Sequence, residues 1–376
     1  PAFSDMHTHL DKGHVWPRTP NPDGTFAGAL GATGSDRERF WSAADVRARM
    51  DFSLRCAFAH GTRRIRTHID SIPPQDRISW PVVAETREAW AGRIDLQAVS
   101  LIGIDGLPEG DALEAFVRHV KEHGGILGAV LYRVDGLGAG VARLFEAAMR
   151  HDMDLDFHVD ENGDPDSRCL ELVAETVIET GFPGARVTCG HCCSLAVQPE
   201  AVAERTLDRV AEAGLSVVTL PMCNLYLQDR VAGRTPRWRG VTLVREMARR
   251  GIRVCAASDN TRDPFYAYGD LDALEVLREA IRILHLDHPV DEAPALVTLN
   301  AAAVMGAADA SLIAPGAPAD LVAFRARGHT ELLARPQSDR IVVRAGRVDR
   351  SEPPDYRELD DVLGPHAGAP APRPDH

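Results

Sequence analysis

The sequence predicts a (β/α)8 barrel, and three observations favour this fold class. The chain has 376 residues, which is enough for one large barrel. Eight short β-like runs alternate with helical patterns, as βα units of a parallel sheet do. No G-x-G-x-x-G motif follows the first run, which argues against a doubly wound dinucleotide-binding sheet.

The predicted elements follow one another at nearly regular intervals. The eight strands are expected at Ala2–His9, Arg64–Asp70, Asp95–Leu101, Gly125–Leu131, Leu155–Asp160, Arg186–His191, Ser216–Leu220 and Arg253–Ser258. Seven amphipathic helices are expected at Ala44–Ala59, Gly110–His123, Val141–His151, Cys169–Thr180, Glu200–Ala213, Thr242–Arg250 and Leu271–His285. In such a barrel, functional groups gather at the carboxyl ends of the strands.

The pattern changes beyond about residue 310. The stretches "PGAPADLVAF" and "RIVVRAGRV" alternate like antiparallel strands, with Gly and Pro at the turns. We therefore expect a barrel over 1–309, a small β-sandwich appendage over 310–350 and a C-terminal extension over 351–376. The last stretch, "GPHAGAPAPRPDH", is rich in Pro, Ala and Gly, so the extension is expected to be partly disordered.

The composition narrows the choice of partners. A formal net charge of −13 argues against nucleic acid and anionic membranes, which attract basic surfaces. No apolar run approaches the roughly 18 residues that a membrane span requires. Seven cysteines, mostly in apolar segments, fit reduced thiols in a cytoplasm. We expect a cytoplasmic protein with a small-molecule partner, and the composition leaves a homo-oligomer open.

Histidines and acids end four of the predicted strands. The first strand carries His7 and His9, which alternate positions direct to one face. The other three strands add His158 and Glu161 in "FHVDEN", His191 in "TCGHCC" and Asp259 in "AASDN". Imidazole and carboxylate ligands suit Zn²⁺, or Fe²⁺ or Mn²⁺ in an open site.

The same pattern predicts a proton carrier. Glu161 lies three residues beyond His158, where the intervening loop takes it toward the cavity and away from the metal. A free carboxyl group beside a metal-activated water is what hydrolysis of a C–N bond needs. The sequence therefore predicts one divalent metal ion and a hydrolytic reaction.

These motifs, in this order, resemble the amidohydrolase superfamily and specifically its cytosine-deaminase-like branch. The matching stretches are "HTHLDK", "NPDGTF", "RTHID", "HVDEN", "GHCC", "PMCNLYLQDR", "SDNTRDPFY" and "GAPADLVAF". The resemblance implies deamination of a nitrogen heterocycle such as a pyrimidine or a triazine. It also implies a barrel with a β-sandwich built from segments on both sides of it, so we expect residues to precede Pro1 in the natural chain.

The resemblance assigns roles to the residues that match the family's motifs. A single metal would be held by His7, His9, His158 and Asp259. Glu161 would protonate a ring nitrogen, His191 would orient the water, and Asp259 would also serve as general base. The fourth strand, "ILGAVLY", offers no lysine to bridge two metals, which agrees with one metal ion.

Positions that contact substrate depart from the cytosine-deaminase pattern. The stretch "LIGIDG" lacks the glutamine that reads the substrate amide in similar cytosine deaminases. Lys12, Asn260 and Phe265 replace a small hydroxyl residue, an aspartate and a tryptophan, respectively. We therefore expect cytosine to be a poor substrate and a more oxidised or substituted ring to be preferred. Together with Phe26 and His191, these three residues are the expected substrate contacts.

Other readings stay open from the sequence. A cyclic amidase or an alkylaminohydrolase acting on a similar ring would use the same constellation. A non-catalytic barrel that binds a small molecule is the alternative outside enzymes. We expect His68 to be a structural residue of the barrel, and Asp11 to hydrogen-bond to backbone or to a ligand imidazole. Asp263 is expected to fix its own loop, and Trp16 is a further candidate for the cavity wall.

Overall fold

The computed structural model describes residues 1–308, 311–336 and 339–364 of the chain. Eight parallel strands occur in two sheets, of order β1-β2-β3 and β4-β5-β6-β7-β8. Their bounds are β1 Phe3–Thr8, β2 Thr62–Asp70, β3 Asp95–Leu101, β4 Val130–Leu131, β5 Leu155–Val159, β6 Val187–His191, β7 Ser216–Thr219 and β8 Arg253–Ala256. Isolated parallel bridges join the sheets at both edges, Thr8 to Asp259 and Val99 to Ile126.

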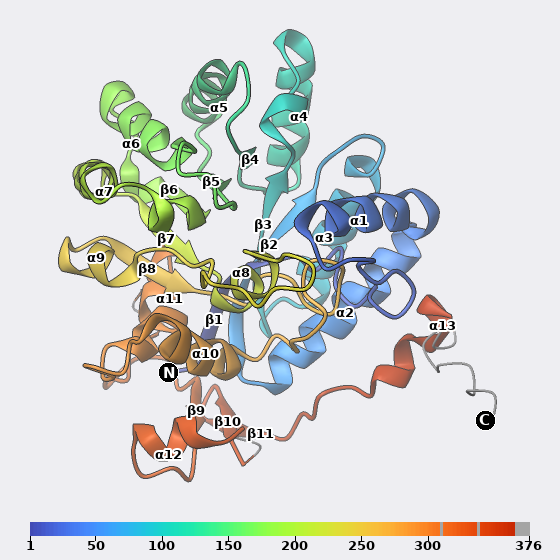
Figure 1. Cartoon of the computed structure of the whole chain (residues 1–376). Coiled ribbons are helices and arrows are strands. Elements are labelled where there is room, and N and C mark those ends of the chain that lie inside the picture. Colours follow the sequence, from blue (N-terminus) through green and yellow to red (C-terminus); the bar gives the residue numbers. More distant parts are fainter. Residues whose placement is uncertain (309–310, 337–338, 365–376) are drawn as a thin grey trace, which may run out of the picture.

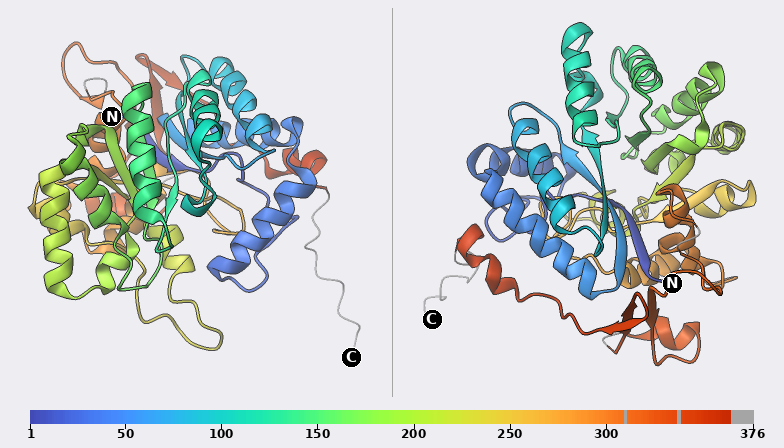
Figure 2. Two further views of the ribbon diagram at one scale, coloured as in Figure 1. Left: turned by 90° about the horizontal axis from the view of Figure 1, so that it is seen from above. Right: turned by 180° about the vertical axis from the view of Figure 1, so that it is seen from behind.

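Helices surround these strands, which gives a TIM-barrel-like α/β fold (Figure 1, Figure 2). The helices are α1 Phe26–Phe40, α2 Ala43–Ala59, α3 Asp76–Ala89, α4 Gly110–Glu122, α5 Leu137–His151, α6 Cys169–Thr180, α7 Glu200–Ala213, α8 Pro221–Leu227, α9 Val244–Arg249, α10 Ala273–Leu284 and α11 Leu299–Val304. Short 3₁₀ turns lie at η1 Ile104–Gly106, η2 Gly184–Arg186, η3 Cys193–Val197 and η4 Ala293–Val297. None of the helices in the described ranges is long and apolar enough to span a bilayer.

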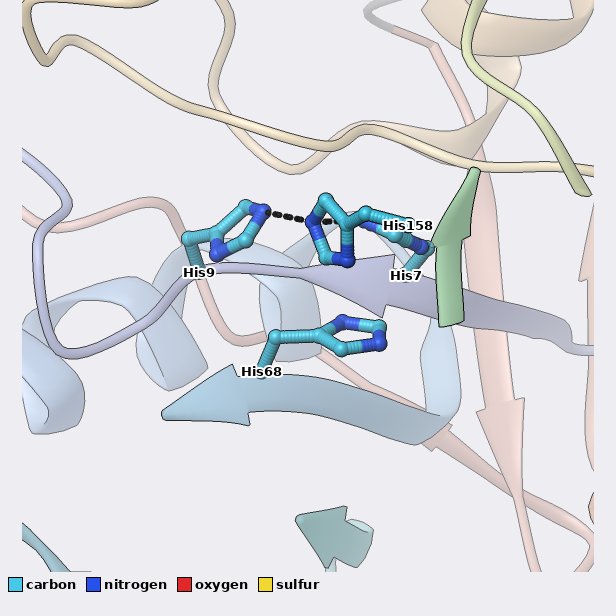
Figure 3. A group of neighbouring side chains, drawn as sticks. All are labelled: His7, His9, His68 and His158. Atoms are coloured by element: carbon cyan, nitrogen blue, oxygen red, sulfur yellow. Dashed lines mark hydrogen bonds between the residues drawn. The ribbon is translucent and has the colours of Figure 1, made fainter. Parts of the chain in front are cut away.

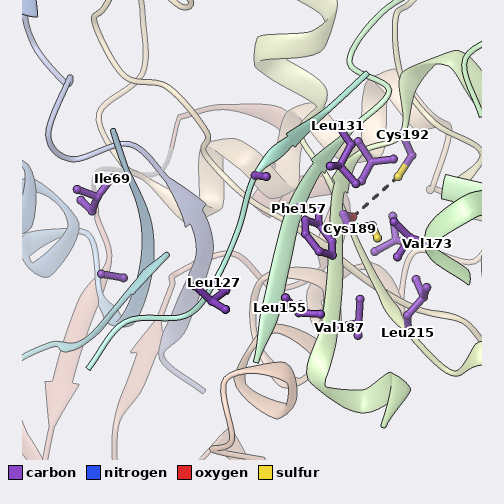
Figure 4. Close-up of a cluster of buried hydrophobic side chains, with 14 of the residues drawn as sticks. Ile69, Leu127, Leu131, Leu155, Phe157, Val173, Val187, Cys189, Cys192 and Leu215 are labelled. Carbon is purple, nitrogen blue, oxygen red and sulfur yellow. Dashed lines mark hydrogen bonds between the residues drawn. The ribbon is translucent and has the colours of Figure 1, made fainter. Parts of the chain in front are cut away.

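Strand alternation separates the core from the polar interior. In β5, Leu155 and Phe157 are fully buried in the apolar cluster between the strands and the helices (Figure 4). Burying side chains of this size stabilises the fold by roughly 1.5–3 kcal/mol each. Asp156 and His158 occupy the intervening positions and face β2, where Arg66 donates to Asp156 at 2.8 Å. The strand ends can therefore present polar groups without weakening the outer core.

The C-terminal region forms a separate antiparallel sheet of order β11-β10-β9. Its strands are β9 Leu321–Ala323, β10 Ile341–Arg344 and β11 Arg347–Asp349, and α12 spans His329–Ala334. The sheet lies beside the start of the chain, where the Ala2 amide donates to the Asp320 carbonyl at 2.8 Å (Figure 2). The Arg344 guanidinium stacks 3.6 Å from the Phe58 ring, which ties this sheet to the end of α2.

Part of the C-terminal extension is ordered against the barrel. Tyr356–Leu359 (η6) and Asp360–Leu363 (α13) are helical, and Leu359 is buried with Phe52 of α2. The Tyr356 hydroxyl donates to Asp270 at 2.6 Å. The Pro-rich end, 365–376, for which disorder was expected, lies outside the described residues.

Two sequence expectations about elements need correction. The expected strand Gly125–Leu131 shrinks to Val130–Leu131: Ile126 and Leu127 make only isolated bridges, and the amide and carbonyl of Gly128 bond to the Ser100 hydroxyl instead of to a neighbouring backbone. Helices α1, α3, α8, α11, α12 and α13 were not expected. Helix α3 escaped notice because Pro81 lies inside it, and proline ordinarily ends a helix.

Candidate active site

Four ligand atoms converge at the carboxyl ends of the strands. The Nε2 atom of His158 lies 3.1 Å from His7 Nε2 and 3.3 Å from His9 Nε2 (Figure 3). The Oδ1 atom of Asp259 lies 3.2 Å from His9 Nε2 and 3.6 Å from His7 Nε2. All four side chains are buried.

The separations between these ligand atoms suit one bound divalent metal ion. Ligand atoms about 2.0–2.2 Å from Zn²⁺ lie roughly 3.3–3.5 Å from one another, close to the separations found here. Burial lowers the pKa of His7, His9 and His158 well below 6.5, and neighbouring cationic groups lower it further, so the imidazoles are neutral. Both carboxylate oxygens of Asp259 lack a hydrogen-bond partner within the described residues. A cation would compensate this buried charge.

His68 lies directly beside this set. Its ring centroid is 4.0 Å from that of His7, and one of its nitrogens lies within 4.8 Å of the ligand atoms of His7, His9 and His158 (Figure 3). Its Nε2 atom is 3.3 Å from Asp156 Oδ1. The structure thus brings His68, expected to be structural, into contact with the candidate ligands while Asp156 holds its other side.

Glu161 is held beside the ligands by its local backbone. Asp160 accepts hydrogen bonds from the Cys169 and Leu170 amides at 3.2 Å, which ties the β5 turn to the start of α6. The Gln228 side chain donates to the Glu161 carbonyl at 3.2 Å. The Glu161 carboxylate lies within 4.8 Å of Cys223 and Asp259. Burial, and then the charge of Asp259, raises the pKa of Glu161 well above its usual range. This carboxyl group can therefore hold a proton near neutral pH.

His191 ends β6 in a left-handed conformation. Its φ is +66°, and Asp259 has a φ of +64°. Non-glycine residues adopt this region at a cost of about 1–2 kcal/mol, and such strain gathers at functional sites. Burial lowers the pKa of His191 to about 3, so its imidazole is neutral.

Asn224 is a site residue that sequence reasoning missed. It lies in the first turns of α8 and is fully buried. Its side-chain nitrogen is 3.0 Å from His191 Nδ1 and 3.4 Å from Glu161 Oε1. The one available signal was its place in "PMCNLYLQDR", a stretch that matches the family, because α8 is too short to show helical periodicity.

Lys12 turns inward, with 4% of its surface exposed. Its ammonium lies 2.8 Å from Asp70 Oδ1 and 5.5 Å from the centroid of the Phe265 ring. Arg37 of α1 donates to the second oxygen of Asp70 at 2.9 Å. Asp11 accepts from the Asp70 amide at 2.8 Å, which confirms its expected bond to backbone.

The remaining expected substrate contacts lie on one wall. Phe26 and Phe265 meet edge to face with ring centroids 5.6 Å apart. Asn260 donates to Asp263 at 2.7 Å, and the same aspartate accepts from the Phe265 amide at 2.8 Å. Asp263 thus fixes its own loop, as predicted. Trp16 is not brought into this wall by any described contact of its side chain.

The fold and the site together define a hydrolase class, and sequence comparison identifies it. The amidohydrolase family model matches residues 119–348, and the chain belongs to this family. The chain is a hydrolase that acts on C–N bonds.

Individual relatives show which enzymes of this family the chain resembles. The chain is 57% identical to a pterin deaminase of Rhizobium rhizogenes over 97% of its length and 83% of the relative's. It superposes on 5-methylcytosine deaminase from Klebsiella pneumoniae with a TM-score of 0.85 and 26% identity, covering 95% of this chain and 87% of the other. N-isopropylammelide isopropylaminohydrolase from Burkholderia multivorans gives a TM-score of 0.74 and 26% identity, with 93% and 85% covered.

Proposed function

We propose that this chain is a metal-dependent deaminase whose substrate is a pterin-like ring, a bicyclic nitrogen heterocycle with an exocyclic amino group. The observation that carries the proposal is the convergence of three imidazole nitrogens and one carboxylate oxygen beside the partly buried Glu161. The identity of 57% with a pterin deaminase supports the choice of ring.

The proposed metal centre holds one divalent ion, Zn²⁺, Fe²⁺ or Mn²⁺. Its ligands are His7, His9, His158 and Asp259, whose neutral rings and unpartnered carboxylate suit such a cation. When bound, the ion lowers the pKa of water and so supplies a nucleophile near neutral pH.

The chain's own residues move the protons. Hydrolysis replaces the exocyclic amino group by an oxygen atom from water: a C–O bond forms, the C–N bond breaks and ammonia leaves. Glu161, which is partly buried and close to Asp259, takes a proton from water and returns it to a ring nitrogen. Asp259 acts as a base that takes the second proton of water and passes it to the amino group, which leaves as ammonia, and His191 donates a hydrogen bond to the water or to a substrate oxygen.

We assign recognition of the substrate ring to four side chains beside the candidate metal ligands, those of Phe26, Phe265, Lys12 and Asn260. Phe26 and Phe265 offer apolar faces to a flat ring, and their mutual contact fixes their orientation. Lys12 and Asn260 place a cation and an amide at the same wall, where Asp70 and Asp263 hold them. These polar groups favour a ring that carries carbonyl oxygens over cytosine.

The proposal includes the chain's organisation. The two bridged sheets form one closed eight-stranded barrel over 1–309, the antiparallel strands of 310–350 are half of a β-sandwich, and 351–376 is an extension. The bridges at Thr8–Asp259 and Gly103–Val130 support closure. We place the protein in the cytoplasm, where its buried cysteines stay reduced.

An ammonia-release assay tests the function. The purified, metal-loaded protein is offered pterin, cytosine, 5-methylcytosine and N-isopropylammelide, with metal content measured in parallel. We expect about one metal ion per chain and a kcat/KM for pterin above about 10⁴ M⁻¹s⁻¹, with cytosine far lower. Release of isopropylamine from N-isopropylammelide, with no release of ammonia from pterin, would favour an alkylaminohydrolase. Efficient turnover of cytosine would contradict the choice of ring.

A further inference from the structure

The side chain of Asn224 touches both groups to which proton handling is assigned. Its Nδ2 atom lies 3.0 Å from His191 Nδ1 and 3.4 Å from Glu161 Oε1. The backbone amide of Asn224 donates to the Leu220 carbonyl at 3.0 Å, which fixes the residue on the first turn of α8. The amide group is therefore held between β5 and β6 by a helix that follows β7.

The chemistry of the amide determines the proton on His191. An amide NH₂ group only donates, so His191 Nδ1 must accept and its ring proton must lie on Nε2. The Nε2 atom is buried and has no partner within the described residues. It is therefore free to donate to a group that enters the site.

The neighbour on the other side sets the orientation of the amide. If the amide were turned over, its oxygen would lie 3.4 Å from Glu161 Oε1, and the two would both be acceptors when Glu161 is ionised. His191 Nδ1 lies 3.4 Å from the same Oε1, from which it can accept a hydrogen bond when Glu161 is protonated. In the orientation described, the same NH₂ group serves Glu161 and His191 together. Gln228, one turn further along α8, holds the backbone of Glu161 by donating to its carbonyl at 3.2 Å.

We propose that Asn224 is a positioning residue that selects the Nε2–H tautomer of His191 and sets its distance from Glu161. The Nε2–H then points at the reacting centre as a hydrogen-bond donor instead of an acceptor. Because the tautomer depends on one neutral amide, it does not require His191 to be charged. The kinetic consequence of this inference rests on the proposed deaminase function. The tautomer assignment does not depend on that function.

Nitrogen-15 NMR of labelled, Zn²⁺-loaded protein tests the tautomer directly. The His191 signals are assigned by their loss in His191→Gln. We expect the wild type to carry the proton on Nε2 and Asn224→Asp to move it to Nδ1, because a carboxylate accepts where the amide donated. A wild-type His191 with its proton on Nδ1 would overturn the proposal, whether or not the protein deaminates pterin.

Kinetics test the consequence for the reaction. Asn224→Asp is expected to lower kcat by about 10²–10⁴-fold while KM changes little, because the lost interaction acts in the transition state. Asn224→Leu, which cannot hydrogen-bond, should also lower kcat. Asn300→Asp is the matched control: Asn300 lies on α11 and donates to the Val254 carbonyl at 2.8 Å, away from the site. Variants of Asn224 that bind metal normally and retain full kcat would contradict the proposal.

Discussion

Two buried polar clusters lie close together in this chain and differ in how their charges are satisfied. In the arginine–aspartate cluster, formed by Arg18, Asp36, Asp45 and Arg49, each aspartate meets an arginine. In the metal-ligand cluster, formed by His7, His9, His158 and Asp259, lone pairs face one another and the carboxylate lacks a donor.

This difference indicates that the arginine–aspartate cluster serves structure, and it supports the proposal that the metal-ligand cluster serves catalysis. Arg18 donates two hydrogen bonds of 2.8 Å to Asp36, and Arg49 donates to the carbonyls of Asp11 and Gly13. The first cluster thus fixes the loop that follows His9. The second would be stabilised by a cation, which the Asp259 carboxylate and the neutral imidazole nitrogens could bind.

The sharpest test of this contrast is the removal of one ligand. His158→Ala is expected to lose the metal and to lower kcat/KM by at least about 10⁴-fold, because the activated water is lost. Metal analysis and an ammonia assay measure both effects. His151→Ala serves as control, since His151 pairs with Glu114 on the outer surface of α5. Full metal content in His158→Ala would show that His158 is not a ligand.

The next effect concerns the proton carrier. Glu161→Gln keeps the shape of the side chain but cannot carry a proton, so kcat should fall by about 10²–10⁴-fold with the metal retained. Glu171→Gln, whose carboxylate pairs with Arg205 at the surface, should leave kcat unchanged. If Glu161→Gln emptied the site of metal, Glu161 would belong to the metal-ligand cluster.

Breaking the arginine–aspartate cluster should affect stability instead of chemistry. Asp45→Ala leaves Arg49, which is fully buried, without its carboxylate and should lower the free energy of unfolding by about 3 kcal/mol. Glu212→Ala removes an exposed partner of Arg209 and should cost less than about 1 kcal/mol. Urea unfolding measures both. Equal losses for the two variants would contradict the distinction between buried and exposed pairs.

Most of the fold follows from local sequence pattern, and the exceptions have physical reasons. Alternating and apolar runs predicted seven of the eight strands closely, since burial on the outer face imposes that pattern. The fourth strand is shorter than expected because the Ser100 hydroxyl takes both backbone hydrogen bonds of Gly128, which only the folded chain reveals. Helix α3 was hidden by Pro81.

The candidate site also contains residues that local sequence pattern could predict and residues that it could not. His7, His158 and Asp259 were predictable because strand ends of a parallel barrel meet on one face. The role of Asn224 was not, because it depends on a short helix that brings residue 224 against residues 161 and 191. The pairing of Lys12 with Asp70 joins the loop after β1 to the end of β2, and no local pattern records it. The ligand and substrate assignments stay predictions until the variants are measured.

The smallest expected effect comes from removing a single hydrogen bond within the arginine–aspartate cluster. The Thr19 hydroxyl donates to Asp36 Oδ1 at 2.6 Å. Burial alone would raise the pKa of Asp36, but the hydrogen bonds from Arg18 and Thr19 outweigh it and hold the pKa below 3.8. Because the folded pKa is depressed, this stabilisation is present above the unfolded pKa and is lost as the pH falls through the folded pKa.

Thr19→Val keeps the shape of the side chain and removes that bond, so it should lower the free energy of unfolding by about 1.5 kcal/mol at pH 7. The pKa of Asp36 should move back toward its ordinary value, since the ionised form has lost a donor. The difference between wild type and variant should therefore shrink as the pH falls below about 4 and through the lowered pKa of Asp36 in the folded wild type, because the carboxyl group is then protonated in both proteins. Urea unfolding across this range measures the difference, and a gap that widened on acidification would show that the hydroxyl does not act through the carboxylate.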